Sequence, residues 1–136
     1  MTDSTRSTKG NILLMDDDDI VLEITSRMLE SYGYTVVLAK NGEEAVQKYR
    51  QALDETGPFD VVILDLTVRG GVGGLGAIKK ILALNPAAKV IISSGYSNDP
   101  TLARYKEYGF CGVMTKPYRL GRLKEDLEEI LGAKES

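Results

Sequence analysis

The chain has 136 residues, the length of one ordinary domain, and no apolar run approaches the ~20 residues that a membrane-spanning helix needs. Seventeen Lys and Arg against twenty Asp and Glu give a net charge of −3, so the sequence predicts neither membrane insertion nor direct binding to nucleic acid. Because the chain has no histidine, it can form no Ser-His-Asp triad, no His-ligated zinc or haem site and no phosphohistidine of its own.

Five short apolar runs, each far enough from the next to leave room for a helix, predict five strands. Residues 1–10 precede them and are polar and rich in Ser and Thr, which indicates a flexible tail. The first, third and fourth runs are continuously apolar, as is typical of parallel strands covered by helices on both faces. The runs begin at Ile12, Thr35, Val61, Lys89 and Gly112.

Between and after these runs, apolar side chains recur with the period of a helix. The fourth helix should begin at Asn98-Asp99-Pro100, where an Asx cap and a proline in the first turn agree. The predicted inward stripes are, in chain order, Ile20/Ile24/Met28, Val46/Tyr49/Leu53, Leu75/Ile78/Leu82, Leu102/Tyr105 and Leu120/Leu123/Leu127/Ile130.

Five β-α repeats with right-handed crossovers predict an α/β fold, a doubly wound, five-stranded parallel sheet with five helices on its two faces. The predicted domain covers residues 11–132, between the tail at 1–10 and a C-terminal tail at 133–136. Functional sites in such folds lie at the carboxyl ends of the strands.

Polar residues follow the predicted strands at this edge. Acidic residues 16–19 follow the first strand, Asp65 follows the third, Ser93-Ser94 end the fourth and Lys116 ends the fifth. Each has an ordinary structural explanation, because acidic residues stabilise a helix start by a few tenths to ~1 kcal/mol and a strand-end Asp commonly begins a turn. Together they bring three or four carboxylates, a hydroxyl and an ammonium to one edge.

Clustered carboxylates need a cation. Two carboxylates ~4 Å apart repel by about 4 kcal/mol at an effective dielectric constant of 20, against a domain stability of ~5–15 kcal/mol. Lys116 supplies one positive charge, and an all-oxygen donor set favours Mg²⁺ over zinc or copper. The sequence therefore predicts a Mg²⁺ site whose open ligand positions can receive a phosphoryl group.

At these residues the chain resembles the response-regulator receiver domain of two-component signalling, over nearly the whole of Asn11 to Leu131. The resemblance implies a flavodoxin-like strand order of 2-1-3-4-5. It is carried by the ordered set Ile12-Leu13-Leu14-Met15-Asp16-Asp17, Val62-Ile63-Leu64-Asp65, Ser94-Gly95 and Thr115-Lys116-Pro117.

The resemblance also implies a role for each residue of the set. Asp65 would be the phosphoacceptor, and the Ser94 hydroxyl and the Lys116 ammonium would contact the phosphoryl oxygens. The Lys116-Pro117 peptide bond would be cis, which would direct the ammonium into the acidic pocket. The ligands of Mg²⁺ would be Asp16, Asp17, Asp65 and the backbone carbonyl of Thr67.

The mechanism implied is Mg²⁺-dependent in-line transfer to Asp65 from a phosphohistidine on a histidine kinase or phosphotransfer domain, followed by slow self-dephosphorylation. The switched surface would contact a downstream protein or the rest of a hybrid kinase, and phosphorylation would promote a dimer. The sequence predicts no DNA-binding or enzymatic output segment after Leu131, as expected of a stand-alone receiver or of one cut from a larger hybrid kinase. The single cysteine, Cys111, cannot form an internal disulfide and no signal peptide is predicted, so we expect a cytoplasmic protein.

The sequence departs from the receiver pattern at one position that matters for the switching mechanism. Receivers usually have an aromatic residue three positions before the lysine, and here that position is Val113. We therefore expect switching to rely on Ser94 and on the glycine-rich loop 70–76, and the resemblance implies that Tyr96 lies beside the phosphoryl group and shields it from water.

Two other functions remain open. A haloacid-dehalogenase-like phosphatase also places an Asp nucleophile, Mg²⁺ and Lys around a parallel sheet, and half of its motif is met by Asp16-x-Asp18-x-Ile20, although Ser93-Ser94 stand where a paired acid is expected. The other is an interaction module that works without phosphorylation. Turnover of p-nitrophenyl phosphate and labelling by acetyl phosphate would discriminate among the three.

Overall fold

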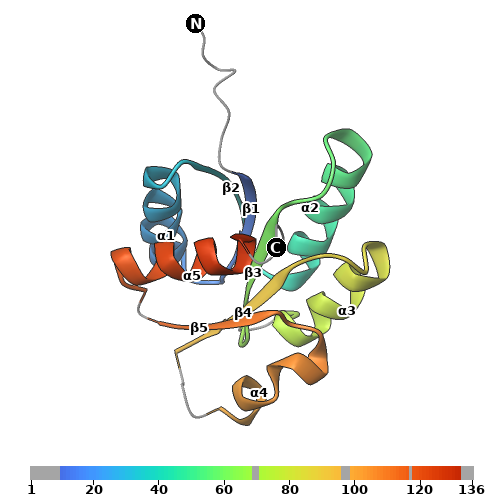
Figure 1. Cartoon of the computed structure of the whole chain (residues 1–136). Coiled ribbons are helices and arrows are strands. Elements are labelled where there is room, and N and C mark those ends of the chain that lie inside the picture. The colour runs from blue at the N-terminus through green and yellow to red at the C-terminus, as the bar shows by residue number, and fades with distance from the viewer. Residues whose placement is uncertain (1–9, 69–70, 96–98, 117, 133–136) are drawn as a thin grey trace, which may run out of the picture.

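The computed structural model describes residues 10–68, 71–95, 99–116 and 118–132, in which strands and helices alternate (Figure 1). A 3₁₀ helix at Tyr105–Tyr108 follows the fourth helix. Within the described ranges, no helix is long and apolar enough to cross a membrane. The elements are β1 (Gly10–Met15), α1 (Asp19–Ser31), β2 (Tyr34–Ala39), α2 (Gly42–Glu55), β3 (Val61–Asp65), α3 (Gly74–Leu84), β4 (Val90–Ser94), α4 (Pro100–Ala103), β5 (Gly112–Thr115) and α5 (Leu120–Gly132).

All five strands are parallel and lie in the order β2-β1-β3-β4-β5, which confirms the predicted fold and strand order. Helices α1 and α5 cover one face of the sheet, and α2 and α3 cover the other (Figure 1). Strand β1 begins at Gly10, one residue before the predicted start of the domain, because Gly10 pairs with Tyr34 of β2.

The sheet separates two hydrophobic cores. Along β1, Ile12 and Leu14 contribute to the core under α1 and α5, whereas Leu13 and Met15 contribute to the core under α2 and α3. This alternation is the two-residue period of a strand, and both faces are apolar because both are covered. The continuously apolar runs of the sequence therefore mark the buried central strands.

The buried face of α1 differs from the predicted stripe. Leu22, Thr25 and Leu29 are buried, whereas Ile20 and Ile24 are 67% and 53% exposed. Both sets have helical spacing, and only the direction in which the chain leaves β1 decides which of them meets the sheet. The prediction of Ile20 and Ile24 as core residues was therefore wrong.

The other predicted stripes supply buried residues, although the side chain of Leu120 lies outside the described part of the molecule. The predicted start of α4 is confirmed at Asp99, whose side chain accepts a hydrogen bond of 2.8 Å from the backbone N–H of Thr101, with Pro100 in the first turn. Buried members of the stripes are Val46, Tyr49, Ile78, Leu102, Leu123 and Leu127.

Candidate functional site

Strand alternation brings four polar side chains to one face of the sheet edge. Asp16 follows β1, Asp65 ends β3, Ser93 lies in β4 and Lys116 follows β5. Side chains two residues apart in a strand share a face, and the residues two positions earlier all lie in the core under α1 and α5. These earlier residues are Leu14, Ile63, Ile91 and Met114.

Lys116 links the two buried aspartates of this group. Its Nζ lies 2.6 Å from Oδ2 of Asp16 and 3.0 Å from Oδ1 of Asp65. Asp16 and Asp65 are only 2% and 5% exposed, so little solvent screens either ion pair. The predicted meeting of the carboxylates with the ammonium is therefore present in the structure.

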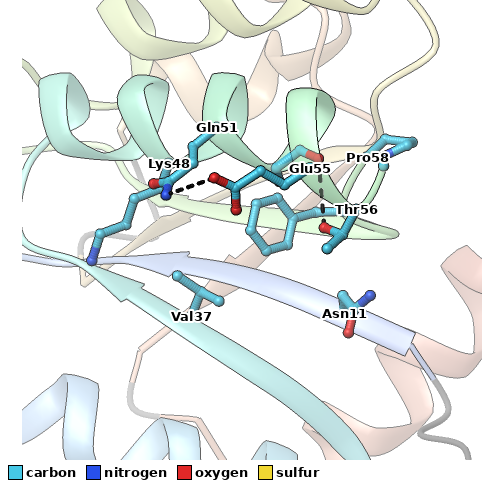
Figure 2. A pocket seen from close by; sticks show the side chains of 10 residues that line it. Asn11, Val37, Lys48, Gln51, Glu55, Thr56 and Pro58 are labelled. Atoms are coloured by element: carbon cyan, nitrogen blue, oxygen red, sulfur yellow. Dashed lines mark hydrogen bonds between the residues drawn. The ribbon is translucent and has the colours of Figure 1, made fainter.

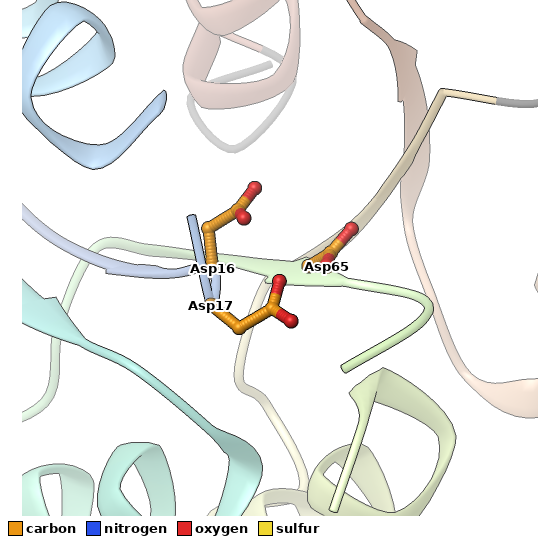
Figure 3. A group of neighbouring side chains, drawn as sticks. All are labelled: Asp16, Asp17 and Asp65. Carbon is orange, nitrogen blue, oxygen red and sulfur yellow. The ribbon is translucent and has the colours of Figure 1, made fainter. Parts of the chain in front are cut away.

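The third aspartate, Asp17, completes an acidic cluster at the ends of β1 and β3 (Figure 3). Asp16, Asp17 and Asp65 each offer a carboxylate oxygen, and these three oxygens lie within 4.8 Å of one another. Asp17 is exposed, which leaves the cluster open to solvent on its side. An all-oxygen set with one open side fits a hard divalent cation that keeps part of its water shell.

The surroundings of Asp65 raise the pKa of its carboxyl group. Burial raises its pKa to about 6, a hydrogen bond from Lys116 opposes the rise, and the neighbouring charges of Asp16 and Asp17 add to it. Although burial alone would lower the pKa of Lys116, its hydrogen bonds to Asp16 and Asp65 raise that pKa above the ordinary value. At neutral pH the site therefore holds a charged ammonium beside carboxylates that repel one another.

The remaining acidic residues after β1 belong to the helix start. The side chain of Asp18 caps α1 by accepting hydrogen bonds from the backbone N–H groups of Ile20 (2.9 Å) and Val21 (3.3 Å). Asp19 forms a surface ion pair of 3.2 Å with Lys40. This agrees with the prediction that only the first two aspartates of the run belong to the site.

The loop after β3 packs closely behind Asp65. A Cβ atom on Gly73 would lie 2.6 Å from the carbonyl oxygen of Leu66, and one on Gly74 would lie 3.0 Å from that of Asp65. Close packing thus requires a glycine at the end of this loop and another at the first position of α3. Thr67, whose carbonyl is predicted to be a metal ligand, is exposed in the same loop two residues after Asp65.

The end of β4 holds a contact that the sequence did not predict. Ser93 and Ser94 are both buried, and the backbone carbonyl of Ser94 accepts a hydrogen bond of 2.9 Å from the N–H of Lys116. The Ser93 hydroxyl is hydrogen-bonded to the hydroxyl of Tyr118. Tyr118 stands two positions after Lys116, and this spacing was the only signal that could have placed it beside the site.

Three predictions concern residues outside the described part of the chain. The cis bond involves Pro117, the shielding role belongs to Tyr96, and the glycine loop includes Gly70. These remain predictions. Val113 is described, and it packs against the core under α2 and α3.

A hollow of about 350 Å³ lies elsewhere, between α2 and the first two strands (Figure 2). Its lining includes Asn11, Val37, Lys48, Glu55 and Phe59. Asn11 stands at the beginning of β1, whereas the acidic cluster follows the end of that strand. The hollow is therefore separate from the site.

Comparison with known proteins agrees with this geometry. The family model described as response regulator receiver domain matches residues 12–128. The transcriptional regulatory protein ZraR of Salmonella typhimurium is 32% identical over 123 residues, which cover 90% of this chain and 26% of ZraR. The chemotaxis protein CheY of Thermotoga maritima is 30% identical over 120 residues, which cover 88% of this chain and 95% of CheY.

Among solved structures, the response regulator protein TrrA from Thermotoga maritima, in complex with Mg²⁺-BeF, is similar with a TM-score of 0.75 and 28% identity. The similarity covers 88% of this chain and 97% of TrrA. The chain thus matches CheY and TrrA over nearly their whole lengths, but it spans only about a quarter of ZraR.

Proposed function

The chain belongs to the response regulator receiver domain family of two-component signalling, and on this premise we propose that Asp65 accepts a phosphoryl group in a Mg²⁺-dependent reaction. The donor would be a phosphohistidine on a histidine kinase or phosphotransfer domain, since this chain has no histidine. The observation that carries the proposal is the buried Asp65 carboxylate, hydrogen-bonded by Lys116 within a cluster of three aspartates.

We assign the metal ligands to Asp16, Asp17, Asp65 and the backbone carbonyl of Thr67. The donor set supports Mg²⁺, because it contains only hard oxygen atoms and TrrA binds Mg²⁺-BeF. When bound, the ion supplies positive charge that offsets the charge on the phosphoryl oxygens.

The side chains around Asp65 would act by positioning and charge. One carboxylate oxygen of Asp65 forms a bond to phosphorus as the bond from phosphorus to the donor's imidazole nitrogen breaks. The Lys116 ammonium, already 3.0 Å from Asp65, would donate hydrogen bonds to the phosphoryl oxygens. The Ser94 hydroxyl would donate another from the end of β4. Slow hydrolysis of the acyl phosphate would then reset the domain.

A protein donor is favoured by the surface beside the site. Ile24 and Met28 of α1 line an apolar groove of about 360 Å³, and Lys116 and Tyr118 line the same groove. Ile20, on the same helix, is 67% exposed. Exposed apolar patches of this kind are typical of protein contacts. We propose that the phosphohistidine-bearing protein covers this groove while its imidazole reaches Asp65.

The output is also a proposal, because the chain spans a quarter of ZraR. We propose that residues 11–132 act as a cytoplasmic receiver unit. Its phosphorylated surface would contact a downstream protein partner, the rest of a hybrid kinase or a second phosphorylated copy. The acidic net charge of −3 supports protein contacts rather than nucleic acid.

Acetyl phosphate labelling followed by mass spectrometry tests the phosphoacceptor role. With Mg²⁺, the protein should gain the mass of one phosphoryl group, and Asp65→Asn should abolish the gain. Asp60→Asn is a matched control, because Asp60 precedes β3 at the opposite end of the same strand and should not affect labelling. Full labelling of Asp65→Asn would remove Asp65 from this role.

The same preparation discriminates the alternatives. Sustained turnover of p-nitrophenyl phosphate would favour the haloacid-dehalogenase-like phosphatase. If the wild-type protein takes no label from acetyl phosphate, an interaction module that works without phosphorylation is favoured instead.

A further inference from the structure

The hydroxyl groups of Tyr118 and Ser93 form a hydrogen bond that joins the segment after β5 to the middle of the site. Ser93 is 1% exposed and lies directly across from Asp65 in the pairing of β3 with β4. Both side chains point toward the layer formed by α1 and α5. The Tyr118 hydroxyl therefore reaches the immediate cross-strand neighbour of the proposed phosphoacceptor.

Backbone carbonyl groups at the end of β4 also accept hydrogen bonds from the residues that follow the two neighbouring strands, β3 and β5. The carbonyl oxygen of Ser93 accepts a hydrogen bond of 2.8 Å from the N–H of Leu66, the residue after Asp65. The carbonyl oxygen of Ser94 accepts one of 2.9 Å from the N–H of Lys116. The hydrogen bond to Ser94 thus fixes the backbone of Lys116. The chain is held again two residues further on, where the Tyr118 side chain bonds to Ser93.

The position of the lysine backbone matters because a lysine side chain is long and flexible. The Lys116 side chain is 20% exposed, so solvent is within reach of an ammonium that leaves the aspartates. The Tyr118 ring packs against the core under α1 and α5, and burial raises the pKa of its hydroxyl to about 12. The hydroxyl therefore stays protonated at neutral pH and remains a hydrogen-bonding partner of Ser93.

We propose that Tyr118 is a positioning residue for phosphoryl transfer, and that its hydrogen bond to Ser93 keeps the Lys116 ammonium between Asp16 and Asp65. This inference rests on the proposed function, because the ammonium is thereby held where it can meet the incoming phosphoryl oxygens. A ring alone would fill the core equally well. The hydroxyl is the part of Tyr118 that the proposal requires.

Removal of one hydroxyl at a time tests the proposal. Tyr118→Phe and Ser93→Ala should each lower the initial rate of labelling by acetyl phosphate about tenfold at saturating Mg²⁺, since small misplacements of a charged group are costly in transfer reactions. The double variant should be no slower than either single variant, because both remove the same hydrogen bond. Ser93→Thr keeps a hydroxyl and should restore most of the rate.

Two further measurements separate positioning from a loss of stability. Mg²⁺ affinity, measured by titration calorimetry, should stay the same or rise in Tyr118→Phe, because a displaced ammonium no longer competes for Asp16 and Asp65. Tyr34→Phe is a matched control, since Tyr34 is a buried tyrosine of the same core at the start of β2. It should leave the labelling rate unchanged even if it lowers the melting temperature.

The position of the ammonium is also measured directly by its ¹H–¹⁵N NMR signal. In the wild-type protein this signal should be protected from solvent exchange, and in Tyr118→Phe it should be lost or broadened. A labelling rate for Tyr118→Phe within about twofold of the wild type, or a fall in rate matched by a fall in Mg²⁺ affinity, would overturn the proposal. If the wild-type protein takes no label, the proposed function fails, and the NMR signal alone still decides the role of Tyr118.

Discussion

Lys116 lies closer to Asp16 than to Asp65, at 2.6 Å against 3.0 Å, and a single ammonium therefore serves two buried carboxylates. Asp17 lies beside them, so this edge of the sheet gathers three carboxylates and the Lys116 ammonium. The cluster keeps a net negative charge that a divalent cation can balance.

Replacement of Lys116 tests this charge balance. Lys116→Ala should leave the fold intact but lower the free energy of unfolding by about 1–3 kcal/mol, because two buried carboxylates lose a hydrogen-bonding partner. Added Mg²⁺ should recover much of this loss, while the response to phosphorylation should be impaired. Urea unfolding with and without Mg²⁺ measures both effects, with Lys106→Ala in the 3₁₀ helix as an exposed control. Unchanged stability of Lys116→Ala would contradict the proposed balance.

Mg²⁺ should raise the melting temperature, because a ligand that binds only the folded state stabilises it by mass action. Asp17→Asn and Asp65→Asn should each reduce the shift, since each removes a proposed ligand. Asp54→Asn, an exposed change near the end of α2, should not. A thermal-shift titration gives the comparison, and equal shifts in all variants would place the ion elsewhere.

Stability without Mg²⁺ should depend on pH through Asp65. Its pKa is raised from 3.8 to about 6 on folding, so the folded protein binds the proton more tightly than the unfolded chain does. The contribution of Asp65 to stability is therefore full below about pH 4 and is lost as the pH rises from 4 to 6. Near pH 7, Asp65→Asn should unfold with a free energy about 1–2 kcal/mol higher than that of the wild type.

Urea titrations of the two proteins across this range should therefore converge at the acidic end. The difference between wild type and variant cancels the contributions of carboxylates that do not interact with Asp65, whereas Asp16 and Asp17 titrate together with it. A gap that widens as the pH falls would show that the pKa of Asp65 is lowered on folding rather than raised.

The exposed isoleucines of α1 should matter for a protein donor and not for a small one. Ile20→Ser with Ile24→Ser should slow phosphoryl transfer from a phosphorylated histidine phosphotransfer protein about tenfold, as expected when contact residues are removed. Labelling by acetyl phosphate and the melting temperature should stay near wild-type values because both side chains are exposed. Equal losses with both donors would instead indicate damage to the site.

The conformational change on phosphorylation should be larger in the loop after β3 than at the surface near β5. Val113 packs against the core and offers no ring that could rotate. Hydrogen exchange with and without a beryllofluoride phosphoryl mimic should therefore change most in residues 66–76 and less in residues 99–120. The reverse distribution would show that the valine does not alter the usual switch.

The order of elements was predictable because it depends on patterns repeated along the whole chain. Continuous apolar runs identified β1, β3 and β4 as buried strands, and parallel connection brought Asp16, Asp65 and Lys116 to one edge. The orientation of α1 was not predictable from period alone, because two stripes of that helix have helical spacing. Choosing between them requires the path of the chain after β1.

The contact between Ser93 and Tyr118 was missed for a different reason. The two residues are separated by 25 positions, and only the pairing of β4 with β5 brings them together. A hydroxyl in an apolar strand gives no sign of its partner. The sequence predicted both serines at the carboxyl edge of the sheet, but it gave no sign that the Ser93 hydroxyl pairs with Tyr118.

The alternation that gathers the site also limits how the chain can change in length. Removing a single residue from within β3 would turn Asp65 toward the layer of α2 and α3, away from Asp16 and Lys116. Removal of one residue from an exposed connecting loop leaves both the strand faces and the buried helix faces unaltered. Insertions and deletions should therefore be tolerated in exposed loops and excluded within the strands, even where the deleted strand residue is aliphatic and could be replaced by another aliphatic residue.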